Sequence, residues 1–213
     1  MLRGMRGTYS IWGAVVSIGL LLAAGSGCGD DGGDSGGSSS TGGAAGAGGG
    51  GGSGGGAPAT CSAYCTTIMA ACTGDAAQYG DNDSCLASCS SFPLGAPGDQ
   101  KDNSLECRAY HANAAKGGAT HCPHAGPAGD GVCGTNCDGY CSLMMKHCGG
   151  AYPSAGDCVT ACANITGASE KGFDIGTKTG DSLFCRIYHA TAASMDPTTH
   201  CDHAKLNPSS ACL

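Results

Sequence analysis

Residues 61–72 read CSAYCTTIMAAC, and this stretch decides the fold of the chain. On an α-helix, where successive residues turn by about 100°, its three cysteines fall within about 40° of one another. Cys85 and Cys89 share a helix face in the same way. Alanine is frequent around these cysteines and is the best helix former. The pattern therefore predicts short helices that present their cysteines on one face.

The cysteine pattern occurs twice in the chain. Its first copy runs Cys61-x3-Cys65-x6-Cys72-x12-Cys85-x3-Cys89-x17-Cys107-x14-Cys122-x10-Cys133. Its second copy runs Cys137-x3-Cys141-x6-Cys148-x9-Cys158-x3-Cys162-x22-Cys185-x15-Cys201-x10-Cys212. Four of the seven spacings are identical, and the two large differences lie in the third and fifth gaps. Because insertions concentrate at the surface, we expect both gaps to be surface loops.

The residues around the cysteines repeat as well. Residues 104–112 read SLECRAYHA, and residues 182–190 read SLFCRIYHA. Residues 120–125 read THCPHA, and residues 199–204 read THCDHA. We interpret the chain as two tandem modules, residues 59–134 and residues 135–213. Only three residues separate the two cysteine patterns, so we expect the modules to lie close together.

The predicted fold class is all-α and disulfide-rich, with three short helices in each module. In the first module these helices cover about residues 60–72, 84–91 and 104–116, and a Gly/Pro-rich tail carries the last two cysteines. Few large apolar side chains are available for its core, and they are Tyr64, Ile68, Met69, Tyr79, Leu86, Phe92, Leu105 and Tyr110. A module of this size with so small a core needs covalent cross-links.

Sixteen of the 17 cysteines belong to the two modules, a density typical of disulfide scaffolds in oxidising compartments. A reduced metal–thiolate protein would show Cys-x2-Cys pairs, and the sequence has none. Two antiparallel helices that face each other with Cys-x3-Cys form two rungs. This rule predicts the pairs Cys61–Cys89, Cys65–Cys85, Cys137–Cys162 and Cys141–Cys158. The remaining cysteines then pair as Cys72–Cys107, Cys122–Cys133, Cys148–Cys185 and Cys201–Cys212. The main alternative joins Cys65 to Cys89 and Cys72 to Cys85.

Residues 1–27 have the features of a secretory signal peptide. Arg3 and Arg6 precede a largely apolar run at residues 11–24, which is followed by small residues and Cys28. The run is about 21 Å long as a helix, too short to span a membrane core of about 30 Å. The expected destination is therefore outside the cytoplasm.

The surroundings of Cys28 resemble the lipobox of bacterial lipoproteins, although Gly25 stands where that motif usually has Leu. The resemblance implies that Cys28 becomes the lipidated N-terminus and anchors the protein in a bilayer. Gly29 after the cysteine favours the outer membrane among such lipoproteins. The alternative is cleavage without lipidation, which gives a periplasmic or secreted protein.

Residues 28–58 contain the anchor and a Gly/Ser-rich segment, which we expect to be a disordered tether. Residues 33–37 within it read GDSGG, as around the nucleophile of trypsin-like proteases. We reject that interpretation, because the fold and upstream residues that such proteases require are missing from the sequence.

Six of the seven histidines occupy matched positions, namely His111, His121, His124, His189, His200 and His203. Three neutral imidazoles per module could hold Zn²⁺ or Cu²⁺ with an open fourth position. The alternative is that these side chains brace loops. Arg108 and Arg186, which follow matched cysteines, are expected to bind loop carbonyls or an acidic side chain. The unmatched His147 is expected at the surface.

The function predicted from the sequence is that of a non-catalytic, membrane-anchored protein of the cell envelope, with an envelope or extracellular partner. The alternative is a metal-binding module that uses the three histidines of each copy. A net charge of −7 without a basic patch argues against nucleic acid, and no catalytic constellation stands out. The whole chain looks like the cysteine-rich lipoproteins of myxobacteria in its tether and in its CR-x-YHA and HC-x-HA segments, a resemblance that implies no activity.

Overall fold

The computed structural model describes residues 57–213, which all belong to one unit of the chain. Within these residues every regular element is helical and none is a strand, which confirms the predicted all-α class. The predicted signal peptide, the tether up to residue 56 and Cys28 lie outside the described residues. In the part of the chain that is described, no helix is long and apolar enough to cross a membrane.

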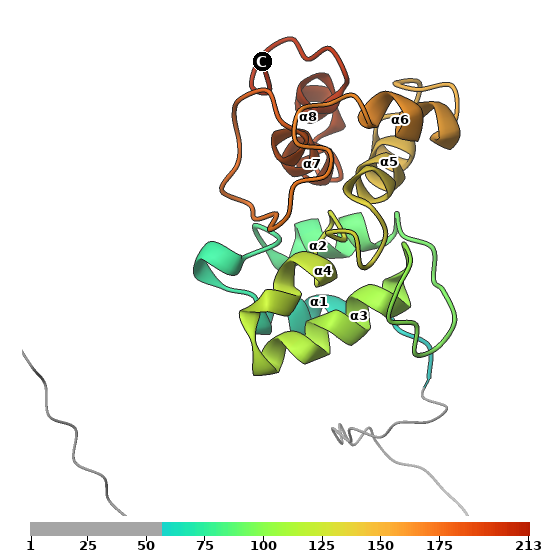
Figure 1. Ribbon diagram of the computed structural model, residues 1–213, viewed down its shortest axis with the longest axis vertical. Coiled ribbons are helices and arrows are strands. Elements are labelled where there is room, and N and C mark those ends of the chain that lie inside the picture. The colour runs from blue at the N-terminus through green and yellow to red at the C-terminus, as the bar shows by residue number, and fades with distance from the viewer. Residues whose placement is uncertain (1–56) are drawn as a thin grey trace, which may run out of the picture. The chain divides into compact units, whose positions relative to one another are not determined.

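The first module contains four α-helices, not three (Figure 1). They are α1 (Cys61–Ala71), α2 (Asn82–Cys89), α3 (Leu105–Ala114) and α4 (Cys122–Ala125). The first three begin and end within two residues of the predicted limits, because Thr60, Asp81 and Ser104 cap their N-termini. The expected tail is wrong in its first part, since Cys122 begins α4.

The second module repeats this order, and its first and last helices are longer than their counterparts. Its helices are α5 (Asn136–His147), α6 (Ala155–Cys162), α7 (Leu183–Ala192) and α8 (Pro197–Ala204). Proline at the first position of α8 and the Asp196 cap fix where this last helix begins, so it reaches eight residues where α4 has four. In each module the fourth helix packs on the third one.

All sixteen module cysteines form disulfides, and four of the predicted pairs are confirmed. Cys61–Cys89 and Cys65–Cys85 join α1 to α2, and Cys137–Cys162 and Cys141–Cys158 join α5 to α6. The alternative pairs Cys65–Cys89 and Cys72–Cys85 do not form. Each pair of antiparallel helices is therefore a two-rung ladder, as the Cys-x3-Cys spacing requires.

The other four predicted pairs, Cys72–Cys107, Cys122–Cys133, Cys148–Cys185 and Cys201–Cys212, are wrong. The structure instead forms Cys72–Cys122, Cys107–Cys133, Cys148–Cys201 and Cys185–Cys212. The reason is the fourth helix, which folds back on the module and brings its cysteine to the C-terminal end of the first helix. The cysteine of the third helix therefore forms its disulfide with the cysteine in the tail.

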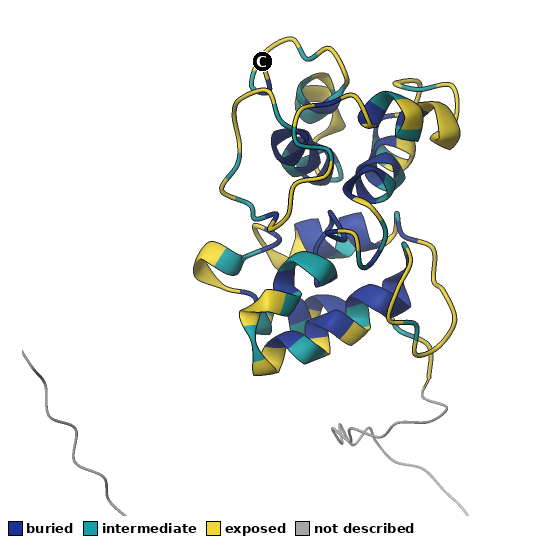
Figure 2. Cartoon of the chain, in the orientation of Figure 1, coloured by how far each residue is buried: buried dark blue, intermediate teal, exposed yellow. Residues whose placement is uncertain are grey.

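The core of each module is small and contains many half-cystines. Figure 2 shows that the buried residues are concentrated on the helices. Of the predicted core residues, five are buried, namely Tyr64, Ile68, Tyr79, Phe92 and Leu105. Met69 and Leu86 are half-buried, and Tyr110 is 42% exposed, so it is not a core residue. Phe92 packs into the hydrophobic cluster of the second module, which ties the two cores together.

The fifth cysteine gap of the second module is not a simple surface loop. Phe173, near its middle, is 1% exposed, and its carbonyl accepts a hydrogen bond of 2.8 Å from the Gln78 side chain of the first module. The Ile175 amide donates to the carbonyl of Ala77 at 3.1 Å. The extra length of this gap is therefore used to dock the second module on the first.

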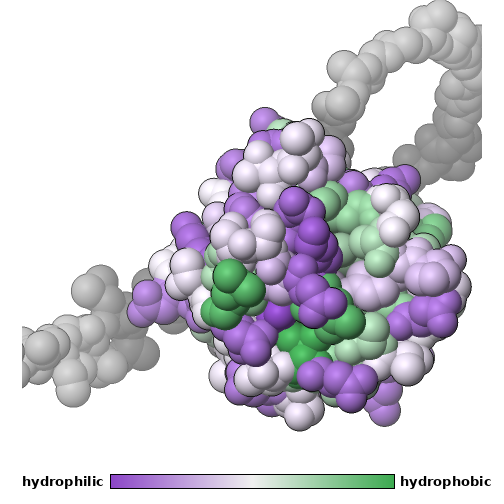
Figure 3. Space-filling view, turned by 90° about the horizontal axis from the view of Figure 1, so that it is seen from above, coloured by the Kyte–Doolittle hydropathy of each residue, from purple (hydrophilic) through white to green (hydrophobic). Residues whose placement is uncertain are grey.

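The outer surface is mixed in character. On the face shown in Figure 3, hydrophobic residues occur in small groups among hydrophilic ones. The exposed large hydrophobic side chains of the described region are Leu94, Tyr110, Met145, Met195, Leu206 and Leu213. Scattered exposed residues of this kind are normal for folded proteins, so they do not by themselves indicate a binding surface.

Candidate metal centres

Each module brings its three matched histidines together. In the first module, His111, His121 and His124 each offer one ring nitrogen within 4.8 Å of the others. The corresponding histidines of the second module, His189, His200 and His203, meet the same criterion. All six histidines named from the sequence thus belong to two clusters, which we call the first and second triads.

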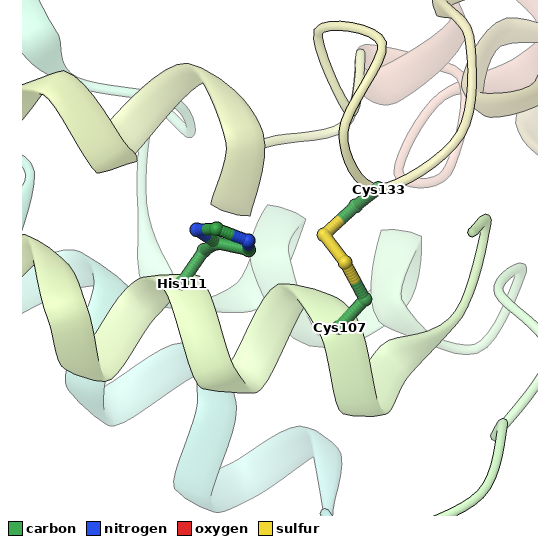
Figure 4. A group of neighbouring side chains, drawn as sticks. All are labelled: Cys107, His111 and Cys133. Carbon is green, nitrogen blue, oxygen red and sulfur yellow. A yellow bond between two sulfur atoms is a disulfide. The ribbon is translucent and has the colours of Figure 1, made fainter. Parts of the chain in front are cut away.

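The disulfides fix the positions of the histidines. His111 lies one turn after Cys107 on α3, and the Cys107–Cys133 disulfide lies beside it on the same side of the helix (Figure 4). His121 precedes α4 and His124 lies within it, while Cys122 between them is bound to Cys72. Two covalent links therefore hold the helices that carry the ligand candidates.

The first two rings of each triad are hydrogen-bonded to each other through their Nδ1 atoms, at a distance slightly shorter than that between two zinc ligands. The Nδ1 atoms of His111 and His121 are 3.1 Å apart, and those of His189 and His200 are 2.9 Å apart. Four-coordinate Zn²⁺ with bonds of about 2.0–2.1 Å holds its nitrogens about 3.3 Å apart. The third ring stands edge-on to the first, at 85° in one triad and 80° in the other. A metal would need this third nitrogen to move closer.

A backbone carbonyl orients the first histidine of each triad. Nε2 of His111 lies 3.2 Å from the carbonyl oxygen of Gln100, and Nε2 of His189 lies 3.1 Å from that of Lys178. A carbonyl oxygen only accepts, so Nε2 donates the proton and the Nδ1 lone pair faces the neighbouring ring. This is how metal-ligating histidines are commonly held in proteins.

The surroundings favour neutral imidazoles, the form that binds metal. Burial lowers the pKa of His111 and of His189, although the carbonyl contact of each opposes this. Burial also lowers the pKa of His124, against the effect of Asp130, and of His200, against the effect of Asp196. These four rings would therefore bind metal near neutral pH without having to lose a proton from a charged form.

The third histidine of each triad has an unsatisfied atom. Nδ1 of His124 and Nδ1 of His203 are buried and have no hydrogen-bond partner among the described residues. Buried polar atoms are nearly always paired, and leaving one unpaired costs about 1–3 kcal/mol. A metal ion would provide the missing partner at the same position in both modules.

The three nitrogen ligands of each triad suit a transition-metal ion of intermediate softness. Three imidazole nitrogens with an open fourth position suit Zn²⁺ and Cu²⁺. The sulfur atoms of Cys107 and Cys133 also lie close to His111, but they are bonded to each other and cannot act as thiolate ligands (Figure 4). The available ligands are therefore the histidines alone.

The matched arginines hold the loops next to the triads, as the sequence predicted. Arg108 donates to the carbonyls of Ser104 and Gly126, and its guanidinium lies 3.7 Å from the centre of the Phe92 ring. Arg186 donates to three carbonyls and also pairs with Asp181 at 2.9 Å.

Two features of this region were not expected from the sequence. His147 is half-buried, and its Nε2 lies 2.8 Å from the Ser91 hydroxyl of the first module, so the predicted surface position is wrong. Asp130 lies 3.6 Å from Nε2 of His124. Asp130 has no acidic counterpart in the second copy, so the repeat gave no signal for it.

Comparison with known proteins shows similarity over part of the chain. A model of the BfoA family C-terminal domain matches residues 57–136, which contain the first module. Aurasperone B biosynthesis cluster protein A, from two strains of Aspergillus niger, is 33% identical over 99 residues, or 44% of this chain and 32% of the relative. The chain thus spans about a third of the length of these curated relatives. No solved structure matches it significantly.

Proposed function

We propose that each module binds one transition-metal ion through its three histidines, and that the protein carries two such ions. The observation that carries this proposal is the repetition of one geometry in two modules whose loops differ in length. In both, two Nδ1 atoms lie at hydrogen-bond distance, close to the spacing of metal ligands, and a backbone carbonyl holds the first ring. A buried, unpaired Nδ1 completes each set.

The third histidine of each triad argues against a purely structural role for the histidines. A histidine that only braces a loop needs a hydrogen bond at each buried nitrogen, whereas His124 and His203 both lack one at Nδ1. Among divalent ions, Cu²⁺ binds a given set of nitrogen ligands more tightly than Zn²⁺ does. We therefore expect both ions to bind and Cu²⁺ to displace Zn²⁺.

The test is the metal content of the full chain, produced by export so that its disulfides form, stripped with a chelator and exposed to Zn²⁺ or Cu²⁺. We expect about two equivalents for the unmodified protein, one after His111→Ala or His189→Ala, and less than about 0.2 for the double variant. His147→Ala is the matched control, because this histidine belongs to neither triad, and it should keep both ions. An unmodified protein that binds less than about 0.2 equivalents would overturn the proposal.

We also propose that the modules act outside the cytoplasm, attached to a membrane through Cys28. Eight disulfides in the described region support an oxidising location. The lipobox-like sequence before Cys28 supports lipidation. Together, the two proposals describe a non-catalytic protein of the cell envelope that is anchored in the outer membrane and binds metal ions.

Mass spectrometry of the N-terminal peptide tests the attachment. An acylated Cys28 supports it, and Cys28→Ala should release the folded protein from the membrane fraction. An exported protein that begins at another residue and carries no acyl chain would remove the anchor and leave the metal proposal untouched.

A further inference from the structure

We propose that the two metal sites are unequal, because Asp130 positions His124 in the first triad and no buried carboxylate pairs with the corresponding His203 in the second. This inference rests on the proposed metal function and adds which site binds more tightly and why. Asp130 is 7% exposed, so its carboxylate is largely removed from water. Its Oδ2 lies 3.6 Å from Nε2 of His124.

The chemistry of a ligating histidine gives Asp130 its role. If Nδ1 of His124 binds the metal, its Nε2 carries the ring proton and needs an acceptor. A carboxylate in that place fixes the tautomer and makes the ligand more basic. At 3.6 Å the contact is longer than a hydrogen bond, so this role requires it to shorten when the ring takes up its ligand position.

The turn that carries Asp130 is held by the second module. The Gly172 amide donates to Oδ1 of Asp130 at 2.9 Å, and the Lys171 ammonium donates to the Asp130 carbonyl oxygen. Asp130 itself has a positive φ of 53°, between two glycines that also have positive φ. One carboxylate oxygen thus faces the first triad, and the other is bound by the docking loop of its neighbour.

The second triad provides the contrast within the same chain. Ser209 stands three residues before the last cysteine, where the first module has Asp130. None of the ion pairs of residues 57–213 involves His203. The adjoining Asp202 is an exposed side chain that pairs with Lys205 at 2.7 Å. His203 therefore lacks a buried carboxylate to orient it.

The experiment compares the sites one at a time in the full chain. His189→Ala/His200→Ala leaves only the first triad, and His111→Ala/His121→Ala leaves only the second. We expect the first to bind Zn²⁺ about 10–100 times more tightly, the range found when an outer-shell partner of a metal ligand is removed. Asp130→Asn should abolish most of this advantage and leave the affinity of the second triad unchanged, whereas Asp130→Glu should restore part of it.

Two further measurements separate positioning of the histidine from docking of the modules. Lys171→Met removes the ammonium at the Asp130 carbonyl but keeps the carboxylate, so it should leave the affinity of the first triad within about threefold. Nitrogen-15 NMR of the His124 ring should show proton on Nε2 in the Zn²⁺ form, and Asp130→Asn should shift that signal. Loss of affinity in Lys171→Met equal to that in Asp130→Asn would assign the effect to docking and overturn the inference.

The outcomes also distinguish the role of Asp130 from the proposal that each triad binds a metal ion. If neither single-triad protein binds metal, both fail. If both bind Zn²⁺ with equal affinity and Asp130→Asn changes nothing, the two metal sites stand and the role of Asp130 is wrong.

Discussion

The two modules share a covalent frame but differ in what fills and surrounds it. Their disulfides connect the same positions of the cysteine pattern, although the fifth gap is 17 residues in one module and 22 in the other. The triads keep nearly the same geometry, with Nδ1 pairs at 3.1 and 2.9 Å. The comparison teaches that the cross-linked helices, and not the loops, determine where the histidines lie.

The differences lie where the modules meet. The first module places Phe92 in the hydrophobic cluster of its neighbour, and the matched position in the second module, Ile165, packs within its own. The second module uses its longer fifth gap to reach back to Gln78 and Asp130. A duplicated unit has thus acquired different contacts on each side of one interface while its internal frame stayed the same.

The disulfide at the C-terminal end of the first helix should have the largest effect on stability, and the effect should be equal in both modules. Cys72–Cys122 and Cys148–Cys201 close segments of 50 and 53 residues. For loops of that length the chain-entropy model gives about 4 kcal/mol. Replacing both cysteines of either pair with alanine should lower the free energy of unfolding by this amount in denaturant titrations. Costs that differ by a factor of two would show that the frames are not equivalent.

Phe92→Ala should have the next largest effect, about 3 kcal/mol. It leaves a cavity in the second module's cluster and removes the ring that faces the Arg108 guanidinium in the first. Ile165→Ala is the matched control and should cost about 2 kcal/mol. Hydrogen exchange should show loss of protection in both modules for Phe92→Ala, but mainly in the second for Ile165→Ala. Changes confined to the first module after Phe92→Ala would contradict the shared packing.

Removing one tyrosine hydroxyl from each module should cost about 1–2 kcal/mol in both. The Tyr64 hydroxyl donates to the carbonyl of Ala125 at 2.7 Å, and the Tyr140 hydroxyl donates to that of Ala204 at the same distance. These carbonyls end the helices that carry His124 and His203, so Tyr64→Phe and Tyr140→Phe leave them unpaired. Thermal unfolding measures the cost, and Zn²⁺ titration should show weaker binding only in the altered module. A neutral Tyr64→Phe would mean that the fourth helix is held by its disulfide alone.

Disulfides and site residues could be predicted from the sequence where they follow from a local pattern, but not where they depend on contacts between distant segments. The first two rungs of each module follow from Cys-x3-Cys spacing, which is local, so Cys61–Cys89 and its counterparts could be derived. The pair Cys72–Cys122 depends on the path of the fourth helix across the module, and no local pattern encodes that path. Matched positions nominated His111 and its partners, but the repeat contained no signal for Asp130.

The smallest effect concerns the loops that hold the first histidine of each triad. Asp102 and Gly180 occupy the same place, two residues before the cap of the third helix, with φ of 69° and 90°. Their amides donate to the carbonyls of Val132 and Ala211, so both loops need a left-handed residue there.

Gly180→Ala should therefore cost about 1 kcal/mol, since a Cβ at this position meets no atom within 4 Å and only backbone strain remains. Asp102→Gly relieves the same backbone strain in the folded state, but it also increases the conformational freedom of the unfolded chain. Because these two effects oppose each other, the free energy of unfolding should change by less than about 0.5 kcal/mol. Denaturant unfolding and Zn²⁺ titration of both variants provide the check. The Lys178 carbonyl, which holds His189, lies two residues before Gly180. A loop shifted by Gly180→Ala should therefore weaken metal binding only at the second site. Equal weakening at both sites would mean that the modules do not hold their metals independently.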